Sequence, residues 1–584
     1  MTSLAQGESV LAVDVGGATT RAVLFDIVEG AYRFVASGSA ASTAEAPFRD
    51  VSAGARAAIT DLQTLTGRSF LDADGRLITP SQADGSGVDA LVSTLSAGPT
   101  LRTVVLGLLS EVSLASGRRL AETSYTRIVD SVGIDDPRQA DQQIDELIRL
   151  QPDAVIIVGG ADGGASRSVQ KIIEPIGLSS YLLAPEKRPA VLFAGNQRLQ
   201  VEVKELLGSV VPSLRVGPNV RPSLELEDLQ PAARELASLY LDVRKRQLQG
   251  VEQLESWSQG TLLPTAYAQA RMLRFLGRVY GGARGAVLGV DLGASAAVVT
   301  AGFKSGVTLK VYPQFGLGED LPGLLQYASL EDILRWSPLD ISAGALRDFL
   351  YQKSLYPSSV AVTTDEQALA QAVARQALFL AMQKARRDFP AEVRTPRPGL
   401  LPYFEPIIAS GAAFGDAPTP AHGLLLLLDG IQPVGIATII FDRNNLLPLL
   451  GAAAEYNCAL PVQVLDSGAF ESLGTVVSLH GAAAAGSTIA RARLVYENGA
   501  EAMADIKAGN LELLPLPHGQ NAKLAITPRH GVNAGFGPGK AGVLTISGGT
   551  MGVVFDGRGR PLNLPNDPGR RRELLKKWLW TVGG

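Results

Sequence analysis

The sequence contains few of the residues that form disulfide bonds and metal centres. It has one cysteine, Cys458, and four histidines among 584 residues. A single cysteine excludes an intrachain disulfide framework, and four histidines do not assemble a zinc pattern at the usual spacings. We therefore expect neither thiol nor zinc chemistry, and we expect Cys458 to lie in the core.

An excess of positive charge is also absent. Lys and Arg number 53 and Asp and Glu number 57, which gives a net charge of -4. Nucleic-acid-binding proteins use a basic excess to displace counterions from phosphates, so nucleic acid is not the expected partner. Hydrophobic residues make up 46% of the chain and charged residues 19%, which is an ordinary globular composition. At about 150 residues per domain, the length predicts several domains and leaves room for a cleft between them.

Signals for secretion or membrane insertion are missing as well. The N-terminus lacks the basic start and small-residue cleavage site of a signal peptide, so the expected compartment is cytoplasmic. The longest apolar stretch, residues 423–441, contains Asp429, Gln432 and Pro433. These residues are costly or disruptive in a helix that faces lipid. We interpret the stretch as buried core and predict no integral membrane segment.

One pattern occurs twice, beginning at Leu11 and at Ala286. In each copy an apolar strand ends in an aspartate, Asp14 or Asp291. A glycine-containing turn with hydroxyl side chains follows, and a second strand leads back beside the first. A single strand-turn-strand of this kind is common, but its recurrence favours a shared function for both copies.

The residue types in the two turns suit a magnesium nucleotide. Glycines permit positive φ and let backbone N–H groups approach an anion, while hydroxyls add donors. An aspartate at a strand end can hold hydrated Mg2+, which prefers carboxylates together with water and phosphate oxygens. Two such hairpins facing each other would enclose a nucleotide. The turn residues are Gly16, Gly17, Thr19, Thr20, Gly293 and Ser295.

The rest of the chain alternates strands and helices before its composition changes. Three apolar runs at 103–110, 153–160 and 189–196 predict strands, which we expect to join the first meander in a mixed sheet. Residues 364–389 predict a long helix, and residues 406–418 predict a strand that enters a glycine turn suited to a nucleotide base. After about residue 457, short strands, the first at 462–470, predict a separate all-β barrel or sandwich.

The last segment, residues 570–580, predicts a basic amphipathic helix whose Trp578 and Trp580 pack on the β region. Residues 316–323 follow a strand and predict a loop that opens a helix. His422 is interpreted as a local packing or capping residue rather than a catalyst.

These features together resemble the actin, sugar-kinase and heat-shock-chaperone ATPase superfamily. More narrowly, seven segments resemble the glutamate mutase L-type family, which is unrelated to the mismatch-repair protein also called MutL. In order they are LAVDVGGATTRAVLFD, AVIIVGGADGGASRSV, PAVLFAGN, GVDLGASAAVV, ALRDFLYQKSLYPSSV, PIIASGAAF and IIFDRNNLLPLLG. The resemblance covers roughly residues 10 to 455.

The resemblance implies an α/β fold with two ribonuclease-H-like, actin-like ATPase domains around a nucleotide cleft, followed by the C-terminal all-β domain. The expected domains are a first lobe at 1–225, a helical bridge at 226–284, a second lobe at 285–456 and the β-rich region at 457–584. It also implies ATP and Mg2+ as cofactors and places Gly411 in the adenosine motif. That motif usually has paired glycines, whereas Ala412 and Ala413 follow here.

Three functions are consistent with this sequence. The leading one is a slowly hydrolysing ATPase in which Asp14 and Asp291 position Mg2+ and the attacking water. Family resemblance implies a chaperone-like companion of an adenosylcobalamin-dependent mutase. The alternatives are a small-molecule kinase on the same scaffold and a scaffold protein whose nucleotide site is degenerate. Asp162 is a further candidate for orienting the water, although it also suits the cap of a helix that starts near Gly164.

Overall fold

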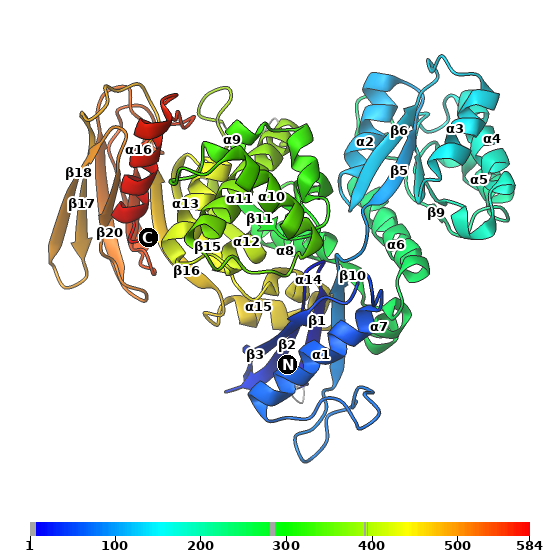
Figure 1. Ribbon diagram of the computed structural model, residues 1–584, viewed down its shortest axis with the longest axis horizontal. Coiled ribbons are helices and arrows are strands. Elements are labelled where there is room, and N and C mark those ends of the chain that lie inside the picture. The colour runs from blue at the N-terminus through cyan, green and yellow to red at the C-terminus, as the bar shows by residue number, and fades with distance from the viewer. Residues whose placement is uncertain (1–7, 281–285, 391–392, 394) are drawn as a thin grey trace. The chain divides into compact units, whose positions relative to one another are not determined.

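The computed structural model describes residues 8–280, 286–390, 393 and 395–584. It divides into two compact units (Figure 1). The first comprises Met1–Ile27, Val35–Ala268 and Leu309–Pro313, and the second comprises Val28–Phe34, Gln269–Thr308 and Gln314–Gly584. The predicted boundary after residue 284 lies outside the described residues, as do residues 1–7 of the N-terminal segment.

The first unit contains a five-stranded mixed sheet with the order β10-β4-β1-β2-β3. β1 pairs antiparallel with β2 and parallel with β4, and β4 pairs parallel with β10. Numbered along the chain, this is the order 3-2-1-4-5 of a ribonuclease-H-like domain, and α1 contacts β1. The elements are β1 Val10–Val15, β2 Thr19–Val28, β3 Ala31–Ala41, α1 Val51–Thr66, β4 Ala90–Leu95 and β10 Leu263–Pro264.

A second sheet is inserted between β4 and β10. All its strands are parallel, in the order β6-β5-β7-β8-β9. The elements are β5 Leu101–Leu106, α2 Ala115–Ala121, β6 Thr126–Val132, α3 Ala140–Leu150, β7 Ala154–Ile157, α4 Ser166–Leu182, β8 Ala190–Phe193, α5 Gln200–Leu207, β9 Leu214–Val216, α6 Gln230–Gln247 and α7 Val251–Trp257. α2 and α6 contact each other and the strands, and Figure 1 shows α3 and α4 side by side.

The prediction that these strands join the first meander is therefore wrong, although the strands themselves are confirmed. Their central residues are apolar and fully buried, as in β7 and β8. Parallel strands covered by helices on both faces read as continuous hydrophobic runs. Such runs show that a strand is central in a sheet, but they do not show which sheet it joins.

The 3-2-1-4-5 order is repeated in β13-β12-β11-β14-β15, a sheet that belongs to the second unit apart from residues 309–312 of β13. Again the first strand pairs antiparallel with the second and parallel with the fourth. The repeat predicted from the sequence is thus confirmed as two sheets of one topology. The strands are β11 Ala286–Leu292, β12 Ala297–Gly302, β13 Val307–Tyr312, β14 Phe404–Ser410 and β15 Gly435–Asp442, preceded by α8 Thr265–Tyr280.

Helices of the second unit follow the sequence signals closely. α11 starts with a capping box between Thr363 and Glu366, as the predicted long helix requires. The apolar stretch at 423–441 supplies the buried helix α13 and strand β15, and no helix of the described residues is long and apolar enough to cross a membrane. The remaining helices are α9 Leu330–Leu334, α10 Ala343–Leu355, α11 Thr364–Ala385, α12 Ala412–Gly415, α13 Pro420–Ile431, α14 Leu446–Tyr456 and α15 Ala459–Leu465.

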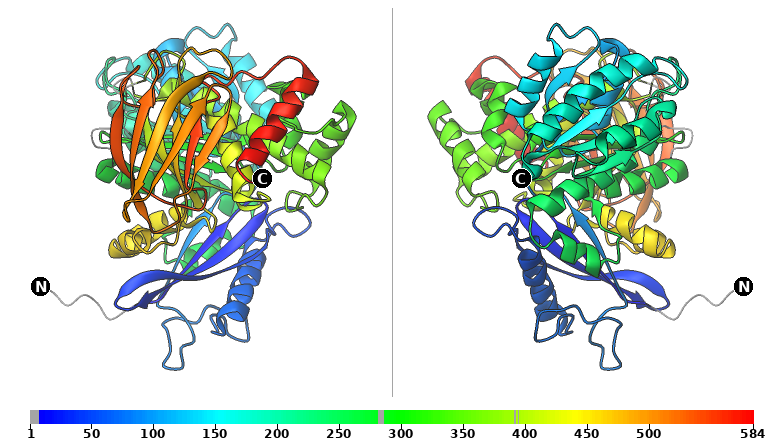
Figure 2. Two further views of the ribbon diagram at one scale, coloured as in Figure 1. Left: turned by 90° about the vertical axis from the view of Figure 1, so that its left-hand side faces the viewer. Right: turned by 90° about the vertical axis from the view of Figure 1, so that its right-hand side faces the viewer.

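The C-terminal region is rich in β-structure, and it continues the sheet of the second unit. β16, β22 and β19 extend that sheet beyond β15, and a separate four-stranded sheet has the order β18-β17-β20-β21. Figure 2 shows α16 beside these strands. The elements are β16 Glu471–Ser478, β17 Thr488–Tyr496, β18 Glu501–Lys507, β19 Leu511–Leu514, β20 Asn521–Pro528, β21 Gly542–Ser547, β22 Val553–Asp556 and α16 Pro568–Thr581.

Three local predictions in this part of the chain are wrong. Residues 462–470 were expected to form a strand, but most of the segment belongs to helix α15 and the turn after it, because its short apolar pattern suits either structure. Cys458 is exposed rather than buried. Trp578 packs and donates from Nε1 to the Gly509 carbonyl, whereas Trp580 is 82% exposed.

Candidate functional site

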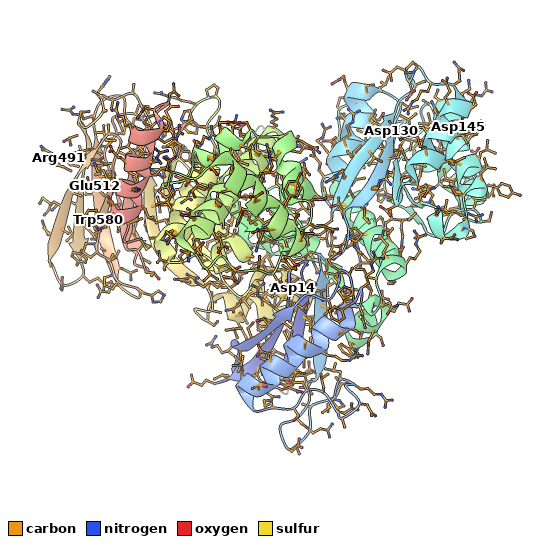
Figure 3. The ribbon with its side chains drawn as sticks, in the orientation of Figure 1. Asp14, Asp130, Asp145, Arg491, Glu512 and Trp580 are labelled. Atoms are coloured by element: carbon orange, nitrogen blue, oxygen red, sulfur yellow. The ribbon has the colours of Figure 1, made fainter. Side chains whose placement is uncertain are left out.

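The first candidate carboxylate, Asp14, lies near the end of β1 and is 3% exposed (Figure 3). Its strand position is directly opposite Thr94 of β4. Asp14 Oδ1 accepts hydrogen bonds from Thr94 Oγ1 at 2.6 Å and from Thr265 Oγ1, at the start of α8, at 2.9 Å. Two hydroxyls from different elements therefore fix the orientation of this carboxylate.

The turn after β1 is tight. Gly16 N donates to Thr19 O at 3.0 Å, and a Cβ added at Gly16 would lie 2.8 Å from that oxygen. Only glycine fits this close approach. Gly17 and Thr19 are half-buried. Thr20 points to the opposite side of the strand, where it is fully buried and its Oγ1 faces Gly54 of α1.

The second candidate carboxylate, Asp291, occupies the equivalent position on β11 and is half-buried. It lies opposite Ser410, the last residue of β14, just as Asp14 lies opposite Thr94. The next residue, Gly411, has φ 92°, and a Cβ added there would lie 2.3 Å from Asp291 Oδ1. The structure thus brings together two residues of the second lobe that sequence reasoning selected separately.

The loop predicted after β13 covers the second turn. Leu317 N donates to Gly293 O and Gly318 N donates to Ala294 O, both at 3.0 Å. A Cβ at Gly316 would lie 2.5 Å from Ala294 O, so the loop packs backbone against backbone. Ser295 is half-buried within this turn. The predicted loop that opens a helix is confirmed over residues 316–320, and its last three residues begin the 3₁₀ helix Leu321–Gln326.

The donor set of these turns fits magnesium bound through a nucleotide. Carboxylate and hydroxyl oxygens are the hard ligands that Mg2+ prefers, and it usually keeps several waters and phosphate oxygens rather than a dedicated protein cage. Among the described residues, no group of three or more His, Cys, Asp or Glu side chains suited to a metal ion occurs. Two hydroxyl side chains contact the Asp14 carboxylate, whereas the backbone of Gly411 closely approaches the Asp291 carboxylate.

Asp162 lies elsewhere, in the loop after β7 of the inserted sheet. Its Oδ1 accepts from Asn219 Nδ2 at 2.9 Å and from Gln197 N at 3.1 Å. It does not cap the helix that follows, since the N-cap of α4 is Ala165, which makes no side-chain capping bond. Both carboxylate contacts hold the inserted sheet's own loops together.

Three hydroxyl residues of the site were missed by sequence reasoning, namely Thr94, Thr265 and Ser410. All three are nearly fully buried. Thr94 belongs to the short apolar run of β4, and Thr265 is separated from Asp14 by the whole inserted sheet. The available signal was a strand-end hydroxyl in an apolar run, which becomes informative only when the pairing of strands is known.

Solved structures with a comparable fold share little sequence with this chain. A diol dehydratase-reactivating factor in nucleotide-free form matches with 10% identity and a TM-score of 0.32, covering 77% of this chain and 99% of that chain. Nucleotide-free acetone carboxylase matches with 12% identity and a TM-score of 0.31, covering 77% and 70%. Similarity at this level carries no information about activity.

Sequence comparison is more specific. Protein MutL of Clostridium tetanomorphum is 25% identical over 181 residues, which cover 31% of this chain and 37% of that protein. The chain therefore matches little more than a third of that relative's length. The sequence model of the family described as MutL protein matches residues 10–468. Since that range includes both aspartate hairpins, the inserted sheet and Gly411, the chain belongs to the MutL protein family.

Proposed function

We propose that this protein binds Mg-ATP and hydrolyses it slowly. Its interaction with a partner protein then depends on the bound nucleotide, and it acts as a chaperone or reactivating companion of that partner. One observation carries the proposal. Two five-strand arrangements of the same order each carry an aspartate near the end of their first strand, opposite a hydroxyl and before a glycine turn. Burying a charge is costly, so an apolar residue would pack better than a carboxylate at the end of these strands. The duplicated aspartates therefore indicate a function other than packing.

In the proposed site, the backbone N–H groups of the two turns bind phosphate oxygens. Gly16, Gly17 and Gly293 keep side chains away from these groups, and Thr19 and Ser295 add hydroxyl donors. Asp14 and Asp291 orient water and hold hydrated Mg2+ at the phosphates. Bound Mg2+ would supply positive charge that offsets the negative charge of the phosphate oxygens. The contribution of the chain is positioning and electrostatic stabilisation, as phosphoryl transfer generally requires.

Two residues that the sequence suggested for the site have other roles in this proposal. Thr20 supports the packing of β2 on α1, since its hydroxyl is buried against Gly54. Asp162 is left out of the nucleotide site because its carboxylate belongs to the inserted sheet. Gly411 is kept as the adenosine-motif residue, and its contact with Asp291 links the base side of the site to the phosphate side.

The proposed partner is an adenosylcobalamin-dependent mutase in the cytoplasm. Membership of the MutL protein family supports this choice, together with the resemblance to companions of such mutases. A protein that couples ATP to a partner needs two states with different affinities for that partner. In this proposal, the nucleotide-bound and nucleotide-free forms are the two states.

The decisive experiment combines a calorimetric titration with ATP and Mg2+ and an assay of ATP hydrolysis, both on the wild type, Asp14→Ala and Asp291→Ala. We expect saturable binding by the wild type and a loss of at least about 100-fold in hydrolysis for each variant. Asp348→Ala, at an exposed position on α10, is the matched control and should behave as the wild type. Unchanged binding and hydrolysis in Asp14→Ala would contradict the proposed site.

Two outcomes separate the alternative functions. ATP turnover that rises only when a small hydroxyl or carboxyl substrate is added would favour a kinase. No ATP binding by the wild type, with stable co-purification of a second protein, would favour a scaffold whose nucleotide site is degenerate.

A further inference from the structure

A cavity of about 230 Å³ lies within the second unit. Its walls come from α11, α13 and α16, from the segment after α9 and from Arg558. Gly293, Ser295 and Gly411 are not among its lining residues, so it is separate from the proposed nucleotide site. An apolar cavity of about 150 Å³ holds a benzene molecule. This cavity therefore has room for one small organic molecule that contains a ring.

Most of the cavity wall is apolar. Trp336, Leu425, Leu575 and Trp578 line it and are buried. Trp580 lies on α16, where Figure 3 labels it, and is the exposed aromatic residue among the lining residues. Cavities of this composition bury the apolar body of a ligand and use a few polar groups to orient it.

The charged groups behind this wall form a chain with one positive charge in excess. Asp429 accepts from Arg375 Nε at 3.0 Å and from Arg558 Nη1 at 2.7 Å. Asp556 accepts from Arg558 Nη2 at 2.8 Å and from Arg560 Nη2 at 2.6 Å. Three arginines thus share two aspartates, all of them buried.

Of the three arginines, Arg375 has N–H donors that are available for a ligand. It is 6% exposed, lines the cavity and donates from Nε alone, with no partner for its Nη atoms among the described residues. Burial lowers the pKa of its guanidinium, against the opposing effect of Asp429. His422 lines the same cavity, and burial lowers the pKa of its imidazole.

Gln371 lies one turn before Arg375 on α11 and lines the same cavity. It is 7% exposed, and its Oε1 has no hydrogen-bond partner among the described residues. A buried polar atom without a partner costs about 1–3 kcal/mol, so such atoms usually have a ligand, a water or a function. Gln371 and Arg375 therefore offer an acceptor and a cation side by side.

We propose that this cavity binds a small organic acid with an apolar body and a hydroxyl or amino group beside its carboxylate. The Nη atoms of Arg375 bind the carboxylate in the bidentate manner typical of arginine. Gln371 Oε1 accepts the hydrogen bond of the neighbouring hydroxyl or amino group. Trp336, Leu425 and Trp578 enclose the apolar body. The site is independent of the nucleotide site and holds whether or not the chain binds ATP.

Mandelate is a suitable probe, because it combines a carboxylate, a hydroxyl and a ring. Three of the four tryptophans line the cavity, so a Trp257→Phe background reports only on that wall by fluorescence. We expect a saturable fluorescence change with mandelate. Mandelamide, which lacks the charge, should bind at least about tenfold more weakly, and phenylacetate, which lacks the hydroxyl, should be intermediate. Equal affinity for mandelate and mandelamide, or no saturable change with mandelate, would overturn the proposal.

Variants locate the site. Arg375→Met should reduce mandelate affinity by at least about tenfold, whereas Arg347→Met, the same change at an exposed position on α10, should not. Should Arg375→Met fail to fold, Ala368→Leu fills the cavity without touching the ion pairs and should also abolish binding. Retained mandelate binding in folded Ala368→Leu or Arg375→Met contradicts the assignment.

Discussion

The two five-strand arrangements that carry Asp14 and Asp291 agree in strand order and register but differ in how each carboxylate is held. Asp14 is nearly fully buried and receives two threonine hydroxyls. Asp291 is half-buried and lies against the backbone of Gly411. The first carboxylate is oriented by side chains, whereas the close backbone approach is the main constraint found around the second.

The surroundings of the two sheets differ in a related way. The first sheet accommodates an inserted parallel sheet between β4 and β10, while the second sheet continues directly into β16, β22 and β19. Strand order near the aspartates is nevertheless the same. The comparison teaches that the central strands and their turn form the preserved part of the duplication, and that additions occur at the connections and at the sheet edge.

The largest effect is expected from Gly411→Ala, which breaks the second arrangement. The added Cβ would lie 2.3 Å from Asp291 Oδ1, at a φ of 92° that side chains rarely adopt. We expect a loss of about 3 kcal/mol in the free energy of unfolding, measured by urea denaturation. Gly415→Ala, four residues later with open space around it, is the control and should be nearly neutral. Equal stability of the two variants would show that the close approach is relaxed in solution.

A smaller effect separates the hydroxyls that lie opposite the two aspartates. Thr94 donates to Asp14, so Thr94→Val should cost about 2 kcal/mol by leaving a buried carboxylate with one bond fewer. Ser410 Oγ is buried without a hydrogen-bond partner among the described residues, so Ser410→Ala should change stability by less than about 0.5 kcal/mol. Urea denaturation of both variants measures this difference. A larger cost for Ser410→Ala would reverse the proposed contrast between the two sites.

The last prediction concerns histidine titration, which belongs to the second unit because all four histidines occur there. Burial, with help from Arg397 and Arg560, lowers the pKa of His480 to about 4. Because the unfolded chain binds this proton near pH 6.5, the neutral histidine contributes stability above that pH. This contribution is lost as the pH falls from about 6.5 to about 4.

His480→Gln removes this titration. The unfolding temperature of the variant should therefore fall by several degrees less than that of the wild type across this pH range, as followed by circular dichroism. His518→Gln, at an exposed position, should keep the pH dependence of the wild type. Identical pH profiles for His480→Gln and the wild type would contradict the buried, neutral state of His480.

Local sequence patterns predicted much of the fold. The repeated strand, aspartate and glycine turn was visible because strands and turns have strong local signatures, and the structure confirms both copies. The helix at α11 was visible from its cap and its length. The segment at 462–470 was not, because a few alternating apolar residues fit a strand and a short helix equally well.

These local patterns could not predict which distant segments of the chain pair with each other. Thr265 reaches Asp14 across 251 residues, and no spacing rule connects them. The strands of the inserted sheet were predicted to join the first sheet. The sequence of a buried parallel strand shows that it is buried, but it does not show which strands lie beside it. Exposure was also misjudged at Cys458 and Trp580, since apolar character alone does not place a residue inside.

The sequence by itself determined the duplicated aspartate hairpin, the glycine at position 411 and the family to which the chain belongs. These depend on residue types within a few positions of each other. Tertiary structure alone decided that Thr94 and Thr265 hold Asp14, that Gly411 touches Asp291, and that Gln371 and Arg375 face a cavity. Such contacts depend on which strands and helices pack together, and packing is a property of the whole chain.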